Sequence, residues 1–263
     1  MKKYAAVFRL AWNRVWVYRG VSIVYLLLSL LNIFLNIVIW QIAYATGTLR
    51  SGISFSFFIS YFLLVIIIHQ LVNSFSAGII AEEHIKHGEL NVFLLKPLHY
   101  FIYMMILEIP WRLFAFILSL PIFALLLVLY KYAFSIQISS LPFLMLTIVL
   151  AYFLSFLIQI TLAQLTFWFE DAHGILSAWE VLWLIFAGAG IPLFFLPPWL
   201  AFINNWLPFQ YIVYFPVMNG LGRLTSTESI RGLFVLCLWI GLFFIAAQFL
   251  WKKGLRKFTG EGI

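Results

Sequence analysis

Long apolar runs alternate with short polar breaks along the whole chain. Six runs stand out, at residues 21–45, 54–80, 101–130, 141–167, 174–196 and 230–251. A helix needs about 20 apolar residues to cross a bilayer, whereas the strands of a membrane barrel alternate apolar and polar residues over about 10 positions. The unbroken runs therefore predict an all-α membrane protein with six transmembrane helices.

Composition strengthens this interpretation. The chain is 65% hydrophobic and only 10% charged, whereas soluble domains carry about 45–50% apolar and about 25% charged residues. The single Cys237 excludes a disulfide within the chain and a cysteine-based zinc site. The net charge of +7 fits basic flanks that face anionic lipid, so we expect membrane lipids as partners and no nucleic acid.

The first 20 residues predict an amphipathic helix in the membrane interface. Arg9, Arg14 and Arg19 interrupt what would be the apolar region of a signal peptide. At helical spacing one face carries Tyr4, Val7, Phe8, Ala11, Trp12 and Val15. The opposite face is basic, which is typical of interfacial helices. A plain basic flank before the first span is the alternative, and both place the N-terminus in the cytoplasm.

Basic residues also predict the orientation. Of the 16 Lys and Arg residues, an N-terminus inside leaves four, Arg50, Lys131, Arg223 and Arg231, on the outer side. The other twelve fall on the cytoplasmic side, as the positive-inside rule requires. Both termini and the polar breaks at 82–100 and 168–173 are therefore predicted to be cytoplasmic.

The outer segment 197–229 is apolar but interrupted by prolines. These are Pro197, Pro198, Pro208 and Pro216. Proline removes a backbone donor and breaks a helix, so one straight span is excluded. Short re-entrant helices are the favoured prediction, and an interfacial loop with the aromatic anchors Trp199 and Trp206 is the alternative.

No catalytic motif occurs in the chain. G-x-x-x-x-G-K-[ST], H-E-x-x-H, G-x-S-x-G and S-x-x-K are all absent, so no nucleotide is bound through a P-loop. His84 and His87, beside Glu82 and Glu83, could in principle hold a metal, but an exposed polar helix is favoured. We therefore expect no catalytic and no metal site.

Ionisable residues inside spans indicate pairing or function. Glu108 and Arg112 are four apart and are expected to pair, although Arg112 could also snorkel. Glu180 has no basic neighbour one turn away, so it meets a partner across helices or lines a polar path. Gly188, Gly190 and Pro192 mark where the fifth span packs closely and bends. These last four residues are the candidates for a translocation path.

Four motifs in order resemble a known family. They are EEHIKHGELNVFLLKPL at 82–98, FEDAHG at 169–174, GIPLFFLPPWL at 190–200 and LPFQYIVYFP at 207–216. On a six-span topology they resemble the permease subunits of ABC-2-type ATP-binding-cassette exporters. The chain looks most like a bacterial subgroup of similar length, often encoded as two different permeases beside one ATPase.

The resemblance implies a single transmembrane domain over 1–263 whose loop at 82–98 carries a coupling helix that docks on a cytoplasmic ATPase. Its implied ATPase contacts are Glu82, Glu83, His84, Lys86, His87, Glu170, Asp171 and His173. Gly88 would end the coupling helix because glycine takes the left-handed cap without strain. Leu94 and Pro97, with their apolar neighbours, would anchor the following segment beneath the membrane.

The same resemblance implies the setting. The chain would be a non-catalytic subunit in the bacterial inner membrane, paired with an identical or paralogous permease and an ABC ATPase dimer. ATP and Mg would bind to the ATPase, and this chain would need no cofactor.

Two alternatives stay open. An ATP-independent transporter or channel would show an internal repeat or charged midplane residues. In a lipid-modifying enzyme, polar groups such as His84 and His173 would come together at one membrane interface.

Overall fold

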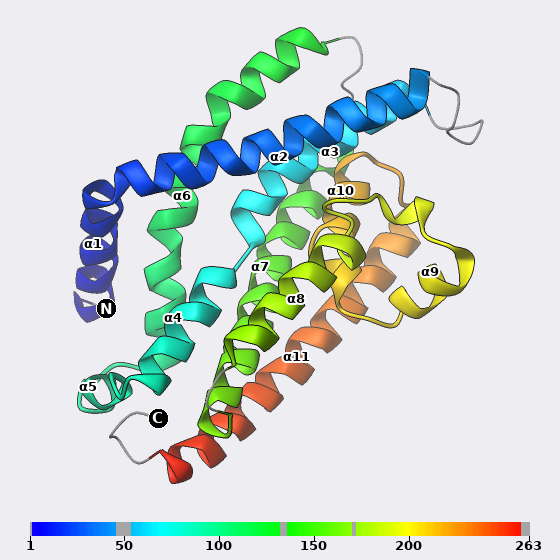
Figure 1. Cartoon of the computed structure of the whole chain (residues 1–263). Coiled ribbons are helices and arrows are strands. Elements are labelled where there is room, and N and C mark those ends of the chain that lie inside the picture. Colours follow the sequence, from blue (N-terminus) through cyan, green and yellow to red (C-terminus); the bar gives the residue numbers. More distant parts are fainter. Residues whose placement is uncertain (1, 46–53, 132–135, 170–171, 259–263) are drawn as a thin grey trace.

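The computed structural model describes residues 2–45, 54–131, 136–169 and 172–258, which form helices and turns without any strand. Figure 1 shows the arrangement. The all-α prediction is thus confirmed for the described part of the chain. The helices are α1 (Lys2–Val17), α2 (Arg19–Ala45), α3 (Phe55–Val72), α4 (Phe75–Lys86), α5 (Leu90–Leu94), α6 (Tyr100–Leu129), α7 (Leu141–Ala163), α8 (His173–Phe186), α9 (Pro198–Asn204), α10 (Tyr214–Gly220) and α11 (Ser226–Lys257).

Four helical stretches of the described residues are long and apolar enough to cross a membrane. They are Phe55–Lys86, Tyr100–Leu129, Leu141–Phe167 and Ser226–Lys257, which match four of the predicted spans. The first of them contains both α3 and α4, and the third ends in the short 3-10 helix η2 (Gln164–Phe167). Helix α2, with 27 residues, covers a fifth predicted span. The total of six crossings stays a prediction.

The predicted fifth span differs from the structure. Helix α8 ends at Phe186 rather than at residue 196. Its 14 residues span about 21 Å, less than the roughly 30 Å of a hydrocarbon core. Gly188 has φ +81°, and the Ala187 carbonyl accepts a hydrogen bond from the distant Tyr214 N–H at 3.0 Å instead of continuing the helix.

Helix α1 is amphipathic, as predicted, and lies along α6 (Figure 1). Val7, Ala11 and Val15 are buried at four-residue spacing. Phe8, which the helical pattern assigns to the same face, remains 37% exposed. The apolar stripe facing the protein is therefore narrower than predicted, while the helix presents its basic side outward.

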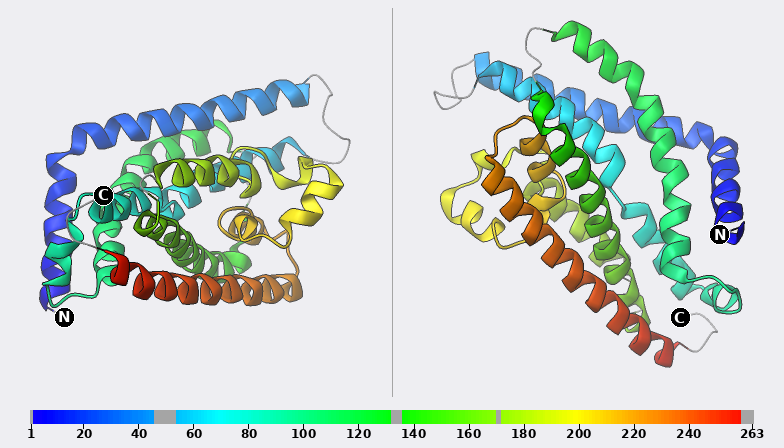
Figure 2. Two further views of the ribbon diagram at one scale, coloured as in Figure 1. Left: turned by 60° about the horizontal axis from the view of Figure 1, so that its bottom comes forward. Right: turned by 180° about the vertical axis from the view of Figure 1, so that it is seen from behind.

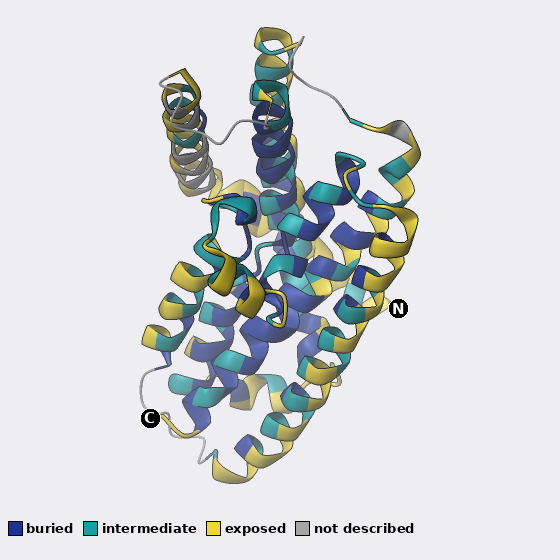
Figure 3. Cartoon of the chain, turned by 90° about the vertical axis from the view of Figure 1, so that its right-hand side faces the viewer, coloured by how far each residue is buried: buried dark blue, intermediate teal, exposed yellow. Residues whose placement is uncertain are grey.

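Helix α3 is the central helix of the bundle. In the most apolar window of the α3–α4 stretch 61% of the residues are buried, compared with 11% in α11. The outer helices carry most of the exposed side chains (Figure 3). Exposed apolar residues are expected on helices that face lipid, because lipid tails are as apolar as leucine.

The outer segment divides into two parts. Helix α10 is buried against α3 and α7, with Phe215, Pro216 and Val217 in contact with the protein interior. Around α9 the large side chains Trp199, Phe202 and Trp206 are more than half exposed. The segment between α8 and α10 also contains two short 3-10 helices, η3 (Leu193–Phe195) and η4 (Phe209–Tyr211). The segment thus contains several short helices, and whether they re-enter the membrane or lie in its interface stays open.

The start of α1, helix α5 and the end of α11 all lie at one end of the bundle (Figures 1 and 2). Helix α9 lies toward the other end. Which side of the membrane this end of the bundle faces stays a prediction.

Candidate functional site

The polar segment 82–98 begins inside α4 and continues beyond the end of that helix. The helix runs to Lys86, and Gly88 then adopts φ +71°. Such a conformation is costly for any residue with a Cβ, which explains the glycine. The prediction that Gly88 ends the helix is confirmed, and α5 follows at once.

The residues predicted to contact an ATPase divide between two faces of α4. Glu83 and His87 are exposed and Lys86 is half-buried. Glu82 and His84, in contrast, are only 3% and 9% exposed. Consecutive helical positions point about 100° apart, so five neighbouring residues cannot share one outward face. Glu82 and His84 are therefore turned toward the protein in this conformation, and their contact with an ATPase stays a prediction.

His84 fixes the loop to the helices beside it. Its Nδ1 lies 3.0 Å from the Tyr100 hydroxyl at the start of α6, and its ring centroid is 4.6 Å from that of Phe93. Tyr100 in turn stacks on Trp251 of α11 at 4.8 Å. The loop is thus held against both α6 and the end of α11.

Glu82 links the two predicted cytoplasmic contacts. Its Oε2 lies 3.5 Å from His173 Nδ1 at the start of α8. Glu170 and Asp171, the other predicted members of the second contact, lie outside the described residues. The pair thus joins α4 to the start of α8.

The segment after α5 is exposed and is held by α1. Leu94 and Pro97 are both exposed, and the neighbouring Leu95 is 88% exposed. The Lys3 ammonium donates to the Pro97 carbonyl, and the His99 N–H donates to the Tyr4 hydroxyl at 3.3 Å. The amphipathic helix α1 thus contacts the segment after α5 through two hydrogen bonds.

The predicted second span is broken at Asn73 and Ser74. Its backbone donors nevertheless find partners: the Asn73 N–H bonds the His69 carbonyl at 3.1 Å, and the Ser74 N–H bonds Ser155 Oγ at 3.3 Å. The Phe75 N–H bonds the Asn73 side chain at 2.9 Å. Asparagine and serine side chains compete for backbone groups in this way. Sequence reasoning missed the break, although the polar run N-S-F-S in an apolar span was a usable signal.

Glu108 and Arg112 of α6 hold both sides of this break. Arg112 donates to the Leu71 carbonyl at 3.1 Å and to Ser74 Oγ at 2.8 Å. Glu108 Oε1 accepts from Ser76 Oγ and from the Ala77 N–H, each at 3.1 Å. The two side chains also pair with each other at 3.0 Å. We call Glu108, Arg112 and their contacts the helix-break clamp.

The clamp opposes the charges of the helix ends. The last carbonyls of α3 carry partial negative charge and receive a guanidinium, while the first N–H groups of α4 carry partial positive charge and receive a carboxylate. Glu108 and Arg112 are 5% and 6% exposed. The predicted pair is therefore confirmed, and Arg112 does not snorkel. Without Arg112 as a flank, eleven basic residues still oppose four.

A comparison with protein families decides the membership of the chain. The family described as ABC-2 family transporter protein matches residues 30–262. The chain belongs to the ABC-2 transporter family. Searches of curated proteins and of solved structures found no significant match.

Membership in the ABC-2 family agrees with the chemistry of the site. Such permeases are in general multi-pass, non-catalytic transport subunits that work with an ABC ATPase. Among the described residues no group of three His, Cys, Asp or Glu side chains could hold a metal. His84 is buried while His87 is exposed, so the two histidines lie in different surroundings.

The candidates for an ABC-2 translocation path are only partly brought together. Glu180 accepts a hydrogen bond from Gln159 of α7 at 3.2 Å, which bears out a partner across helices. The Gly188 carbonyl accepts from the Tyr61 hydroxyl of α3 at 2.6 Å. Gly190 and Pro192 belong to the turn that follows α8. Glu180 thus faces α7, while the other three shape the end of α8.

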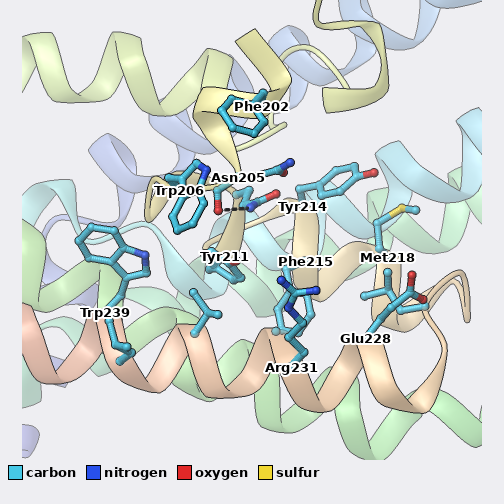
Figure 4. Close-up of a pocket in the computed structure, with 15 residues that line it drawn as sticks. Phe202, Asn205, Trp206, Tyr211, Tyr214, Phe215, Met218, Glu228, Arg231 and Trp239 are labelled. Carbon is cyan, nitrogen blue, oxygen red and sulfur yellow. Dashed lines mark hydrogen bonds between the residues drawn. The ribbon is translucent and has the colours of Figure 1, made fainter. Parts of the chain in front are cut away.

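A pocket of about 640 Å³, here called the outer pocket because residues 197–229 are predicted to face outward, lies between the α9–α10 region and the first turns of α11. Aromatic side chains supply most of its labelled lining in Figure 4. No motif indicated it, because its walls come from segments that are separated along the chain. None of the four path candidates lines this pocket.

Proposed function

We propose that this chain is the transmembrane permease subunit of an ABC-2-type exporter, and that a separate cytoplasmic ATPase drives it through the loop after α4. Family membership supports the permease role. The observation that carries the coupling is that α4 runs without interruption from the helix-break clamp to the exposed residues Glu83 and His87. Both a contact surface and a stiff connection into the membrane are therefore available.

The clamp suggests how force is transmitted. A push on Glu83 and His87 moves α4 as a rod, because its internal hydrogen bonds resist bending. At the break the Ser74 and Phe75 N–H groups bond side chains rather than carbonyls four residues earlier, so rotation would concentrate there. Glu108 and Arg112 would guide the rod about α6, and the Glu82–His173 contact would pass the motion to α8.

The proposal includes a setting. Two such permeases, identical or paralogous, would pair with two ATPase subunits that bind ATP and Mg. The end that carries α5 would face the cytoplasm of a bacterium, with both termini of the chain on that side. Export direction follows from the ABC-2 type to which the motifs point.

Charge reversal on the exposed face of α4 tests the coupling. We expect Glu83→Arg/His87→Glu to weaken co-purification with the ABC ATPase encoded beside this permease about tenfold or more, because reversed charges oppose a complementary surface. The measurement is a pull-down in detergent, with size-exclusion chromatography to confirm a folded permease. Arg223→Glu, an exposed reversal predicted on the opposite side, serves as the matched control and should leave binding unchanged.

A substitution at Glu82, the buried neighbour of Glu83, separates a folding defect from a loss of ATPase binding. Glu82→Arg should impair folding itself, since it places a cation beside His173 in a buried position. Wild-type binding by the double variant would place the ATPase contact elsewhere. A folded wild-type permease that captures no ATPase would instead favour the secondary transporter or channel. Loss of a lipid-modifying activity in a transport-competent His84→Ala variant would favour the enzyme.

A further inference from the structure

The outer pocket has an apolar body with charge at one end. Its aromatic walls include Phe202, Trp206 and Trp239 (Figure 4). Glu228 and Arg231 lie near the start of α11, at the other end of the labelled set. An apolar surface with charged residues at one end is suited to binding an amphipathic ligand.

Arg231 is the charge available to a ligand. It is exposed, it is the only basic residue among those lining the pocket, and its guanidinium makes no ion pair within the described part of the chain. Glu228, the one acidic lining residue, is already engaged: its Oε2 accepts from the Thr225 N–H and hydroxyl, each at 2.8 Å. The pocket therefore offers a free cation beside a carboxylate that caps α11.

An apolar stripe leads away from the pocket along α11. Leu238 lines the pocket, and Leu242, Ile245 and Phe249 follow it at intervals of three or four residues. All four are between 47% and 66% exposed. Residues at this spacing share one face of a helix. The stripe runs from the charged end toward the opposite end of the bundle, as acyl chains run from a headgroup into a bilayer.

We propose that this pocket binds a phospholipid of the adjacent membrane leaflet, with the phosphate on Arg231 and the acyl chains along the α11 stripe. Arginine is suited to phosphate because its planar guanidinium donates two parallel hydrogen bonds. Trp206 and Trp239 suit the headgroup depth, where tryptophan is enriched. The volume accommodates a headgroup with its glycerol, and the chains lie outside it on the stripe.

Native mass spectrometry of the delipidated permease tests this site. We expect Arg231→Gln to weaken binding of dioleoyl phosphatidylglycerol about tenfold, because a charge-assisted contact to phosphate is lost. Dioleoylglycerol has the same chains without phosphate, and it should bind weakly to wild type and variant alike. Arg223→Gln, which removes another exposed arginine outside the pocket, should retain wild-type binding. No ATPase is needed, so the result is independent of the coupling proposal.

A second variant addresses the apolar part of the pocket. Val235→Trp fills space beside Leu238 and should lower phosphatidylglycerol affinity while Arg231 remains. Equal phosphatidylglycerol binding by wild type and Arg231→Gln would overturn the proposal. So would an intersubunit disulfide formed efficiently by Trp206→Cys in a Cys237→Ser background, because a second copy of the chain would then cover the pocket.

Discussion

Arg112→Ala is expected to lower the free energy of unfolding by about 3–5 kcal/mol, because it leaves the Glu108 carboxylate buried without its partner. The substitution also removes the donors to the Leu71 carbonyl and to Ser74 Oγ. Both losses fall on the break between α3 and α4, where no helical ladder compensates. The measurement is thermal or denaturant unfolding of the purified permease in detergent.

Three comparisons separate charge from geometry. Arg112→Lys keeps the charge but loses the guanidinium that reaches three acceptors, so its stability should lie between wild type and Arg112→Ala. Arg9→Ala removes an exposed arginine of α1 and should change stability by less than about 0.5 kcal/mol. A loss of under about 1 kcal/mol in Arg112→Ala would contradict a structural role for the clamp.

The double variant Glu108→Leu/Arg112→Leu tests the function of the clamp. Replacing both charges removes the buried unpaired carboxylate, so this variant should be more stable than Arg112→Ala although the Leu71 carbonyl and the Ala77 N–H lose a side-chain partner. If the clamp guides α4, this variant should fold, bind the ATPase and yet lose most ATP-driven transport. Full transport by the folded double variant would show that the pair serves stability alone.

Gly188→Ala is expected to destabilise the protein by about 2–3 kcal/mol, through a strained backbone and a steric clash. Gly188 has φ +81°, which an L-residue adopts only at a cost. A Cβ there would lie 2.7 Å from the Tyr61 hydroxyl, which now donates to the Gly188 carbonyl at 2.6 Å. Relief of the clash would therefore break that hydrogen bond.

Gly241→Ala is the matched control, because a Cβ at that position of α11 meets no atom within 4 Å. It should be neutral or stabilise slightly, as alanine favours helix over glycine. Tyr61→Phe combined with Gly188→Ala removes the clash and leaves the backbone strain, so it should recover part of the stability. A Gly188→Ala protein as stable as Gly241→Ala would contradict the conformation of this turn. Unfolding in detergent is again the measurement.

Much of the architecture could be predicted from the sequence because it depends on the solvent. In lipid every backbone group must be satisfied internally, so long apolar runs become helices wherever they lie. The same reasoning locates α6, α7 and α11 closely, and the basic face of residues 2–19 predicts α1. The end of α4 at Gly88 could also be predicted, since a glycine after a short polar helix commonly ends that helix.

Local pattern did not determine which polar residues turn inward. Glu82 and Glu83 are identical neighbours, and only the position of α8 makes one a buried partner of His173 and leaves the other exposed. Glu108 and Arg112 were readable as a pair. Their contacts with Leu71, Ser74 and Ala77 depend on how α6 packs against a span more than 30 residues away in sequence.

The sequence by itself determined that lipid surrounds the chain, that the chain is helical and where most spans lie, because composition and the length of the apolar runs carry that information. Its motifs indicated the family. Only the tertiary structure decided the break in the second span, the early end of α8 and the outer pocket. The physical reason is the same in each case. An interrupted helix in lipid persists only where other elements satisfy its freed backbone groups, and Glu108, Arg112 and Ser155, like Tyr61 and Tyr214, reach those groups from distant parts of the chain.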